Sequence, residues 1–474
     1  MLFRFLKTLL GMKPSKGAIP KPPSSQEASV KQFRRPVAAQ VSAASQKPSR
    51  TAAAKTTVKL TLAQEEAVRA ASGPDPAVFL TGRAGTGKST IIDYLRSQEN
   101  VVVCAPTGIA ALNCRGATLH STFKIPPRFL DPQYPNPKNV QGLNKARLLV
   151  IDEISMVRAD VLDFVSATLQ YNRNSSAPFG GLKVIFVGDC RQLPPVVTDQ
   201  ERSAVGARYT SPWWFDAHCM KALTLKVIQL THIHRQRDPQ LIELLEKVRH
   251  GSIDPTALAD LNARCYRGPV APESALILTA RRKDAENLNQ MRLEAIPSES
   301  HIYVATATGS FQTEKDTNVP SPLRLELKVG ARALVTKNHG AIVNGTLGTV
   351  TGLQDRSVSF RADGSDEDVT LTETNWEQYR YSLQNGQFVP EVIGTYRQIP
   401  LTHGWAVTVH KAQGLTLDSV CVDLGSGAFA SGQTYVAMSR TRTIDALSTR
   451  RPFRQLDFIA ERRVSEFHAQ HAVL

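Results

Sequence analysis

The chain has 474 residues, 42% of them hydrophobic, and a formal net charge of +15, which indicates a soluble globular protein of two or three domains. It contains no apolar run of the roughly 18 to 20 residues that a bilayer span needs, and its six cysteines form no CxxC pair and no Cys/His cluster at zinc spacing. These features exclude an integral membrane protein and a zinc-stapled fold, and they predict reduced core thiols.

Most of the excess positive charge lies at the N-terminus. The first 60 residues hold twelve Lys or Arg against a single acid, Glu27, a net charge of +11, which leaves +4 for the rest of the chain. Residues 14–57 are rich in Pro, Ser, Ala and Lys, so we predict a disordered basic tail over 1–57. Its first 13 residues form a basic amphipathic pattern, open to interpretation as an organelle presequence, an interfacial anchor or a partner-binding tail. The net charge of the folded part is therefore too small to predict a polyanionic partner, and such a prediction has to rest on its motifs.

Four apolar segments from residue 77 to residue 189 predict the strands of a parallel sheet. They read AVFLTG, VVVCAP, ARLLVIDE and LKVIFVGD, and they alternate with helix-like stretches. Such alternation is typical of an α/β protein whose ligands bind at the carboxyl ends of the strands. A second α/β set begins near Val227, and short antiparallel strands with tight turns interrupt it from about Leu334 to Pro400. That interruption predicts a small β-barrel insert.

The segment GRAGTGKST fits the pattern GxxxxGK[ST] and lies between a predicted strand and a predicted helix. In this context the backbone N–H groups of the loop face the β-phosphate, Lys88 reaches the β and γ oxygens, and Ser89 binds Mg²⁺. The sequence therefore predicts an ATP site with Mg²⁺ as cofactor. The predicted nucleotide-binding residues of this loop are Gly82, Arg83, Ala84, Gly85, Thr86, Gly87, Lys88, Ser89 and Thr90.

The segment LLVIDE ends in the acid pair Asp152-Glu153. In a P-loop protein the first acid holds the Mg²⁺ shell and the second polarises the attacking water. The alternative is a pair of capping acids for the helix that starts after Ile154, because carboxylates are also favourable at a helix N-terminus. We favour the catalytic interpretation, since the pair follows Lys88 by about 64 residues in a predicted parallel sheet. At this point P-loop kinases, GTPases and many ATPases all remain open.

Two arginines in the second part of the chain are candidates to stabilise charge on a transferring phosphoryl group. Arg235 follows a predicted strand, and Arg440 ends a helix-like segment in YVAMSRTRT. Arginine presents a rigid head with several donors, and an ATPase that works between two lobes needs such cations from the opposite lobe. Taken singly, each arginine is equally well explained as an ordinary ion-pair residue.

Nine blocks follow one another in the chain between about residue 60 and about residue 445: LTLAQEEAV, GRAGTGKST, APTGIAALNCRGATLHSTF, VIDEISMV, PFGGLKVIFVGDCRQLPPV, HRQ, VNGTLGTV, GWAVTVHKAQGLT and YVAMSRTRT. Taken together in this order, they strongly resemble the superfamily-one 5′-to-3′ DNA helicases of the PIF type (petite integration frequency), relatives of RecD. Several blocks are specific to this branch, notably DEISM, FGG before GDxxQLPPV, and HKAQG. The N-terminal tail and the C-terminal end lie outside the resemblance.

The resemblance implies two RecA-like P-loop NTPase lobes, each a parallel sheet with flanking helices. ATP would bind in the cleft between them, and single-stranded DNA would lie across both. The expected domains are the disordered basic tail (1–57), a first RecA-like ATPase domain (58–228) with a small wedge insert (about 115–145), the first part of a second RecA-like domain (229–333), an SH3-like β-barrel insert (334–400), and the remainder of the second domain with a C-terminal tail (401–474).

The resemblance also implies a role for each matching residue of the nucleotide site. The implied roles are adenine reading by Gln64, phosphate binding by Gly82, Gly85, Gly87, Lys88 and Ser89, Mg²⁺ binding by Ser89 and Asp152, activation of water by Glu153, sensing of the γ-phosphate by Gln192, charge stabilisation by the arginine fingers Arg235 and Arg440, and an approach of backbone to the nucleotide at Gly414.

The candidates for contact with DNA lie in two parts of the chain. Thr107 and Gly108 begin a predicted helix after VVVCAP, where a hydroxyl and free N–H groups suit a phosphate oxygen. His120, His410 and Lys411 match family motifs for DNA contact, although a histidine taken singly is more often a core or capping residue.

Phe123 and the proline-rich KIPPRFLDPQYPNP that follows it are interpreted as the wedge, with an aromatic ring available for stacking on a base. The alternative is a surface loop with buried anchors. Phosphate and stacking contacts together predict binding with little sequence preference and a steep dependence on salt.

The favoured hypothesis is an ATP-dependent DNA helicase and translocase that moves 5′ to 3′ and unwinds duplex in replication, recombination, repair or telomere and genome maintenance. Expected partners are single-stranded DNA and tailed or forked duplex, with RNA–DNA hybrids left open because backbone grip does not itself read the 2′-OH. The alternatives are an RNA helicase and a nucleotide-switched DNA-binding factor, which would not require every hydrolysis residue. We expect a monomer without a membrane span, in a bacterial or phage-infected cytoplasm or nucleoid, or in a mitochondrial matrix or nucleus.

Overall fold

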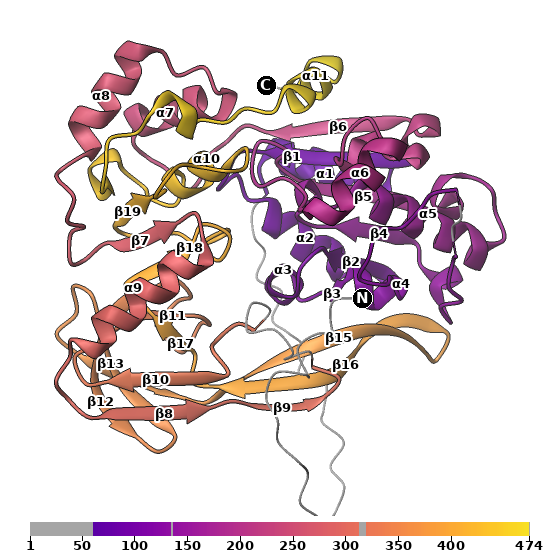
Figure 1. The fold of residues 1–474 in the computed structure, drawn as a ribbon. Coiled ribbons are helices and arrows are strands. Elements are labelled where there is room, and N and C mark those ends of the chain that lie inside the picture. Colours follow the sequence, from indigo (N-terminus) through magenta and orange to yellow (C-terminus); the bar gives the residue numbers. More distant parts are fainter. Residues whose placement is uncertain (1–59, 134–135, 312–318, 474) are drawn as a thin grey trace, which may run out of the picture. The chain divides into compact units, whose positions relative to one another are not determined.

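The computed structural model describes residues 60–133, 136–311 and 319–473, and the predicted basic tail lies outside them. The described part consists of two α/β lobes, an antiparallel β insert and a C-terminal helix (Figure 1). All six cysteines are free and five of them are buried, as the prediction of reduced core thiols requires. No helix in the described ranges is long and apolar enough to cross a membrane.

The first lobe is built on a six-stranded parallel sheet in the order β3-β2-β4-β5-β1-β6. Its strands are β1 (Ala77–Gly82), β2 (Val101–Ala105), β3 (Ala117–Thr118), β4 (Leu148–Ile151), β5 (Lys183–Gly188) and β6 (Leu225–Leu230). Its helices are α1 (Leu62–Ser72), α2 (Lys88–Arg96), α3 (Gly108–Asn113), α4 (Leu119–Phe123), α5 (Ala159–Arg173) and α6 (Asp199–Arg208). Strands β1, β2 and β4 are buried along their whole length, as strands with helices on both faces must be. The predicted parallel sheet is confirmed, and the carboxyl ends of β4, β5 and β1 lie side by side.

Strand β6 ends the first lobe later than the sequence indicated. It pairs with β1 in parallel register, so the expected boundary between residues 228 and 229 falls inside a strand. A Cβ on Gly82, at the end of β1, would lie 2.6 Å from the carbonyl oxygen of Leu230, at the end of β6. The chain therefore leaves the first lobe next to the predicted nucleotide loop.

The second lobe contains a four-stranded parallel sheet in the order β18-β7-β19-β20. Its strands are β7 (Leu276–Thr279), β18 (Ala406–Thr408), β19 (Val420–Asp423) and β20 (Leu447–Thr449). Its helices are α7 (Pro239–His250), α8 (Pro255–Cys265), α9 (Arg282–Glu294) and α10 (Gln433–Met438). Both α7 and α8 begin at a proline that follows a capping aspartate, a combination that favours helix initiation. Strand β18 pairs with β7 although the whole β insert separates them in sequence.

The antiparallel insert begins at Ser300, earlier than the expected position near Leu334. A two-stranded sheet, β10-β8, and a five-stranded sheet, β14-β13-β12-β11-β17, contribute to one apolar core, as expected of a small barrel. The strands are β8 (Ser300–Val304), β10 (Arg324–Lys328), β11 (Arg332–Val335), β12 (Leu347–Gln354), β13 (Ser357–Ala362), β14 (Asp368–Thr372) and β17 (Leu401–His403). Strands β8 and β10 are short, and their buried side chains, Tyr303, Leu325 and Leu327, pack in the core that they share with the five-stranded sheet, so their local sequence does not mark the start of the insert.

A long hairpin of the insert packs against the first lobe. Its strands are β15 (Thr374–Gln384) and β16 (Gln387–Gln398), and β9 (Thr306–Gly309) pairs with β16. Asn385 and Gly386 join the strands at positive φ values of 50° and 77°, as a two-residue hairpin turn requires. Near this turn, Tyr381 and Phe388 are buried in the first-lobe core, and the Tyr381 hydroxyl accepts a hydrogen bond from the N–H of Val103 at 2.8 Å.

The C-terminal helix, α11 (Arg462–Gln470), returns from the second lobe to the first (Figure 1). Phe467 stacks on Phe215, with ring centroids 4.2 Å apart and an interplanar angle of 4°, and it lies edge-on to Trp214. Phe458, just before the helix, belongs to the core of the second lobe. The chain therefore crosses from one core to the other within a few residues.

We expect Phe467→Ala to lower the free energy of unfolding by about 3 kcal/mol, because it removes a buried aromatic ring from the first-lobe core. Phe467 is 4% exposed, whereas Phe429 is 56% exposed, so Phe429→Ala is the matched control and should cost much less. Denaturant unfolding of both variants measures the difference. A loss of unfolding free energy in Phe467→Ala as small as that in Phe429→Ala would show that α11 does not contribute to the core.

Candidate nucleotide site and nucleic-acid groove

The loop between β1 and α2 has the backbone geometry of a phosphate-binding loop. Gly85 and Gly87 have positive φ values of 82° and 83°, which residues with a Cβ rarely adopt. A Cβ on Gly85 would lie 2.4 Å from Cβ of Arg235, and one on Gly87 would lie 2.6 Å from Nε2 of Gln64. The glycines are therefore required by the turn and by the close approach of two predicted site residues. Helix α2 begins at Lys88, so its N-terminus faces the loop.

Lys88 is held inside this loop. Its ammonium group donates hydrogen bonds to the backbone carbonyls of Gly82 at 2.7 Å and Arg83 at 3.1 Å. Burial lowers the pKa of Lys88, and the carboxylates of Asp189 and Glu153 oppose this shift. The amine thus lies at the predicted position, between the loop and a group of acids.

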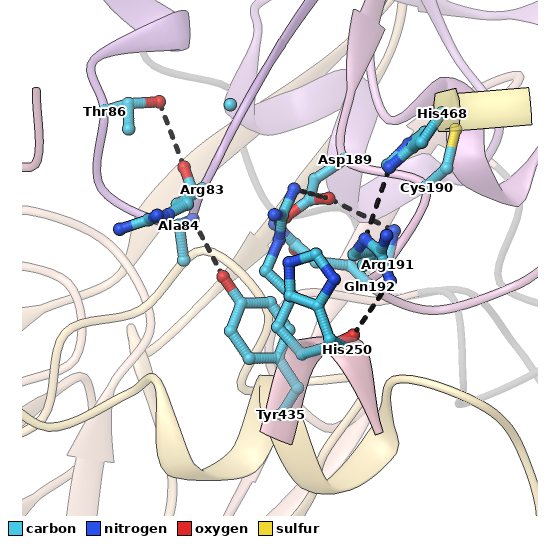
Figure 2. Close-up of polar contacts among 12 residues, drawn as sticks. Arg83, Ala84, Thr86, Asp189, Cys190, Arg191, Gln192, His250, Tyr435 and His468 are labelled. Atoms are coloured by element: carbon cyan, nitrogen blue, oxygen red, sulfur yellow. Dashed lines mark hydrogen bonds and ion pairs between the residues drawn. The ribbon is translucent and has the colours of Figure 1, made fainter. Parts of the chain in front are cut away.

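The second lobe contacts the loop directly. The N–H of Ala84 donates to the hydroxyl of Tyr435, in α10, at 3.4 Å (Figure 2). The hydroxyl of buried Thr86 donates to the loop's own backbone at 3.0 Å, so it stabilises the turn. Ser89 and Thr90 lie in the first turn of α2, and Ser89 is exposed. The loop is therefore covered on one side and open at Ser89.

Asp152 and Glu153 follow β4 directly. Glu153 has a positive φ of 50°, which is sparsely populated by residues with a Cβ, and its N–H donates to Oδ1 of Asp152 at 2.9 Å. The side chain of Glu153 makes no capping bond to the 3-10 turn that follows, Ile154–Met156, so the described structure does not support the interpretation as capping acids. Burial raises the pKa of both carboxyls, and repulsion from Asp152 adds to the effect at Glu153. A carboxylate with a raised pKa is a stronger base, as activation of water requires.

Asp189 follows β5 and forms a buried ion pair with Arg249 of α7, with an N–O distance of 3.2 Å. Burial acts to raise the pKa of Asp189, but Arg249 and Lys88 hold it below its ordinary value. Gln192 is 6% exposed and donates from Nε2 to Asp189 at 3.4 Å. A Cβ on Gly432 of the second lobe would lie 2.2 Å from the carbonyl oxygen of Gln192. Gln192 therefore lies where the two lobes touch.

Arg235 and Arg440 both reach the backbone around Gly414. Arg235 donates to the carbonyl of Gly414 at 2.9 Å, and its Nη1 atom is buried without a hydrogen-bond partner among the described residues. Arg440 donates to the carbonyls of Leu415 at 3.4 Å and Val436 at 2.7 Å. Burial, aided by the charge of Arg235, lowers the pKa of Arg440 to about 9. Two neighbouring guanidinium groups with a donor to spare suit an anionic ligand.

Several residues join this site that sequence reasoning did not single out as site residues: Asp189, Arg249, Gln236, Gln413 and Tyr435. Buried Gln236 donates to the carbonyls of Ser439 at 2.9 Å and Thr441 at 3.3 Å, which connects the neighbour of Arg235 to the neighbours of Arg440. Asp189 had a sequence signal, because it is an acid at the end of a buried strand. Gln236, Gln413 and Tyr435 lie within the quoted blocks HRQ, HKAQG and YVAMSRTRT, but no individual role was predicted for them, and Arg249 had no signal.

A separate groove of about 490 Å³ is lined by the first lobe, the β insert and the second lobe. Its lining combines cations, amides and aromatic rings: Arg115, Lys337, Lys411, Asn113, Asn338, Asn344, Asn375, Trp376 and Tyr379. Nζ of Lys337 lies 5.5 Å from the ring centroid of Trp376. Cations suit phosphate oxygens, and the half-buried ring of Tyr379 suits a base, whereas Trp376 is only 6% exposed and packs in an apolar cluster. The lining also carries Glu377, but its three cations outnumber this acid, so it has the chemistry of a groove for a single strand without sequence preference.

The predicted DNA contacts are only partly brought together. Lys411 lines the groove, and Gly108 lines a smaller cavity between α3 and β15. Thr107 caps α3, since its hydroxyl accepts a hydrogen bond from a backbone N–H of that helix at 3.2 Å. His120 is exposed on α4, and His410 is half-buried beside Lys411 in the chain. Neither histidine is part of the groove lining.

The prediction that Phe123 offers its ring to a base is wrong. The side chain is fully buried in the first-lobe core, because α4 turns its apolar face inward. Ile125 and Val140, from the segment that follows, belong to the same core. The described residues of this segment therefore fit the alternative interpretation, a surface loop whose apolar anchors are buried.

Comparisons with known proteins find one family and many relatives. A family model described as PIF1-like helicase matches residues 59–258. The ATP-dependent DNA helicase Pif1 of Bdellovibrio bacteriovorus is 31% identical, over 78% of this chain and 83% of its own length. The ATP-dependent DNA helicase PIF1 of Mus musculus is 32% identical, over 81% of this chain and 58% of its own length. The chain thus spans about three fifths of such eukaryotic relatives.

Solved structures of Pif1 from Bacteroides match 88% of this chain and 97% of their own chains. The unliganded protein gives a TM-score of 0.80 and the complex with ADP-AlF4 gives 0.79, both at 33% identity. The structure bound to ssDNA gives 0.64 at 34% identity. At nearly equal identity and coverage, the TM-score is therefore lower for the structure bound to ssDNA than for the other two.

Proposed function

Because this chain belongs to the PIF1-like helicase family, we propose that it is an ATP-dependent DNA helicase that moves 5′ to 3′ along single-stranded DNA and unwinds duplex DNA. One observation carries the proposal: a phosphate-binding loop and an acid pair from the first lobe meet two arginines from the second. The turn after β18, residues 409–415, contacts this site and also lines the groove. A motor needs such a shared element, because hydrolysis must change the grip on the strand.

The first lobe supplies most of the groups that bind the nucleotide. The backbone of the loop and the N-terminus of α2 receive the phosphates of ATP. Lys88 exchanges its carbonyl partners, Gly82 and Arg83, for the β and γ oxygens. Gln64 lies against Gly87, to whose carbonyl it donates at 3.4 Å, and contacts the base. Adenine and phosphates are thus bound from adjacent sides of the same loop.

Hydrolysis requires groups from both lobes. Glu153 accepts a proton from the attacking water. Arg235 and Arg440 donate to the γ-phosphate oxygens as negative charge redistributes in the transition state. Because these arginines belong to the second lobe, catalysis depends on lobe closure. Gln192 lies at the contact between the lobes, so its interaction with the γ-phosphate couples nucleotide binding to lobe closure.

Mg²⁺ would be held by Ser89 and Asp152. The exposed hydroxyl and the adjacent strand-end carboxylate fit a metal that takes one carboxylate and completes its shell with phosphate oxygens and water. The described ranges contain no group of three His, Cys, Asp or Glu able to cage a metal, which agrees with a metal held mainly through the nucleotide. Bound there, Mg²⁺ neutralises charge on the phosphates.

The test combines ATP hydrolysis with unwinding. Single-stranded DNA should stimulate hydrolysis, and a duplex with only a 5′ single-stranded tail should be unwound. Unwinding from a 3′ tail alone would overturn the direction. Hydrolysis that is indifferent to DNA would overturn the motor and favour a nucleotide-switched DNA-binding factor. An RNA–DNA duplex with the same 5′ DNA tail shows whether hybrids are also substrates.

A further inference from the structure

A single hydrogen bond joins the turn after β18 to the predicted catalytic base. Nε2 of Gln413 donates to Oε2 of Glu153 at 2.9 Å. Gln413 belongs to the second lobe and Glu153 to the first, so the bond spans the cleft. A hydrogen bond from an amide to a carboxylate is stronger than one between neutral groups, and this one occupies an oxygen that a base needs for the proton of water.

The same residue lines the groove. Lys411, Gln413 and Leu415 all contribute to its lining. The turn that carries them is held by its own hydrogen bonds, from the N–H of Gln413 to the carbonyl of His410 at 3.2 Å and from the N–H of Leu415 to the carbonyl of Ala412 at 3.1 Å. A ligand that moves any part of this turn therefore moves Gln413 with it.

Glu153 is poised to respond to the loss of this bond. Its backbone has a φ of +50°, an arrangement that persists only when the surroundings stabilise it. Its N–H is bound to Asp152, whereas its carboxylate is bound across the cleft to Gln413. Release of Gln413 thus frees the carboxylate while the backbone stays in place.

We propose that Gln413 is a latch on Glu153, and that nucleic acid in the groove opens it by displacing the turn. The latch suppresses ATP hydrolysis until a strand is bound, which deepens the proposed function and rests on it. Among the Bacteroides structures, the one bound to ssDNA matches this chain less well than the unliganded one, with a TM-score of 0.64 against 0.80. By linkage, the same bond must also oppose the binding of DNA.

The first test is ATP turnover of Gln413→Ala with and without a saturating DNA oligonucleotide. We expect turnover without DNA to rise on the order of 10-fold, as the loss of a hydrogen bond to a charged group predicts, with turnover on DNA little changed. Gln290→Ala is the matched control, because Gln290 is an exposed glutamine of the same lobe, on α9, and it belongs neither to the groove lining nor to the nucleotide site. An unchanged rate without DNA, or rates that fall equally with and without DNA, would overturn the latch.

The second test removes the latch from the other side. In the absence of nucleotide, Glu153→Ala should bind a fluorescent single strand more tightly than Asp152→Ala, by on the order of 10-fold. Both variants remove one carboxylate from the same site, so their general electrostatic effects on DNA are matched. Equal affinities would overturn the proposal. If DNA stimulates turnover of the wild type but the variants behave as the wild type does, only the latch is refuted. If DNA does not stimulate turnover of the wild type, the proposed motor function is refuted as well.

Discussion

Glu153→Gln should bind ATP and single-stranded DNA much as the wild type does, while its DNA-stimulated ATP turnover falls by about 100-fold to 10,000-fold, the range expected for loss of a general base. The amide keeps the size of the side chain but cannot accept the proton of water. Glu153 lies beside Lys88 and Asp152, and burial together with repulsion from Asp152 raises its pKa, as a general base requires. Steady-state turnover and nucleotide binding, measured on the same preparation, separate the chemical step from binding.

Glu99→Gln is the control for this experiment. Glu99 is an exposed glutamate of the same lobe and follows the C-terminal end of α2, opposite to the end that faces the loop, so its change should leave turnover intact. Normal turnover in Glu153→Gln would contradict the assignment of the base. A parallel loss of ATP binding would show that the side chain supports the pocket and not the chemistry.

Arg235→Ala is the second change with a large expected effect: turnover should fall about 1,000-fold or more, as loss of an arginine finger does. The side chain donates a hydrogen bond to the carbonyl of Gly414, and its Nη1 atom is buried without a partner among the described residues. Its removal should therefore change folding stability much less than catalysis. Thermal unfolding and turnover of one preparation test both statements.

Arg235→Lys distinguishes a rigid donor head from a simple positive charge. Lysine supplies a compact charge but not the planar fork, so we expect it to restore little of the lost turnover. Arg237→Ala is the matched control, since Arg237 is an exposed arginine two residues further on. Full activity of the lysine variant would show that charge alone suffices. Full activity of Arg235→Ala would exclude Arg235 from the chemistry.

The nucleotide loop and the acid pair could be predicted from sequence because each is a continuous segment. In GRAGTGKST the glycines permit the positive φ values that the loop adopts at Gly85 and Gly87. In LLVIDE the strand ends where the apolar run ends. Since both strands are parallel, their carboxyl ends meet at one edge, and spacing alone places Lys88 near Asp152 and Glu153.

The partners of these residues could not be predicted in the same way. Arg249 meets Asp189 because α7 packs against the end of β5, and Gln413 meets Glu153 because the two lobes face each other. Such pairs join residues far apart in the chain. Sequence periodicity reports only on neighbours within a few turns or strands, so it carries no signal for them.

By itself the sequence determined the α/β class, the parallel sheets, the phosphate loop, the acid pair and the two arginines, because local backbone preferences and short motifs specify them. Only the tertiary structure decided which side chains are available. Phe123 is buried in the core, the insert begins at Ser300, and α11 adds Phe467 to the first lobe. Burial depends on which distant surfaces pack together, and that choice is made by the whole chain.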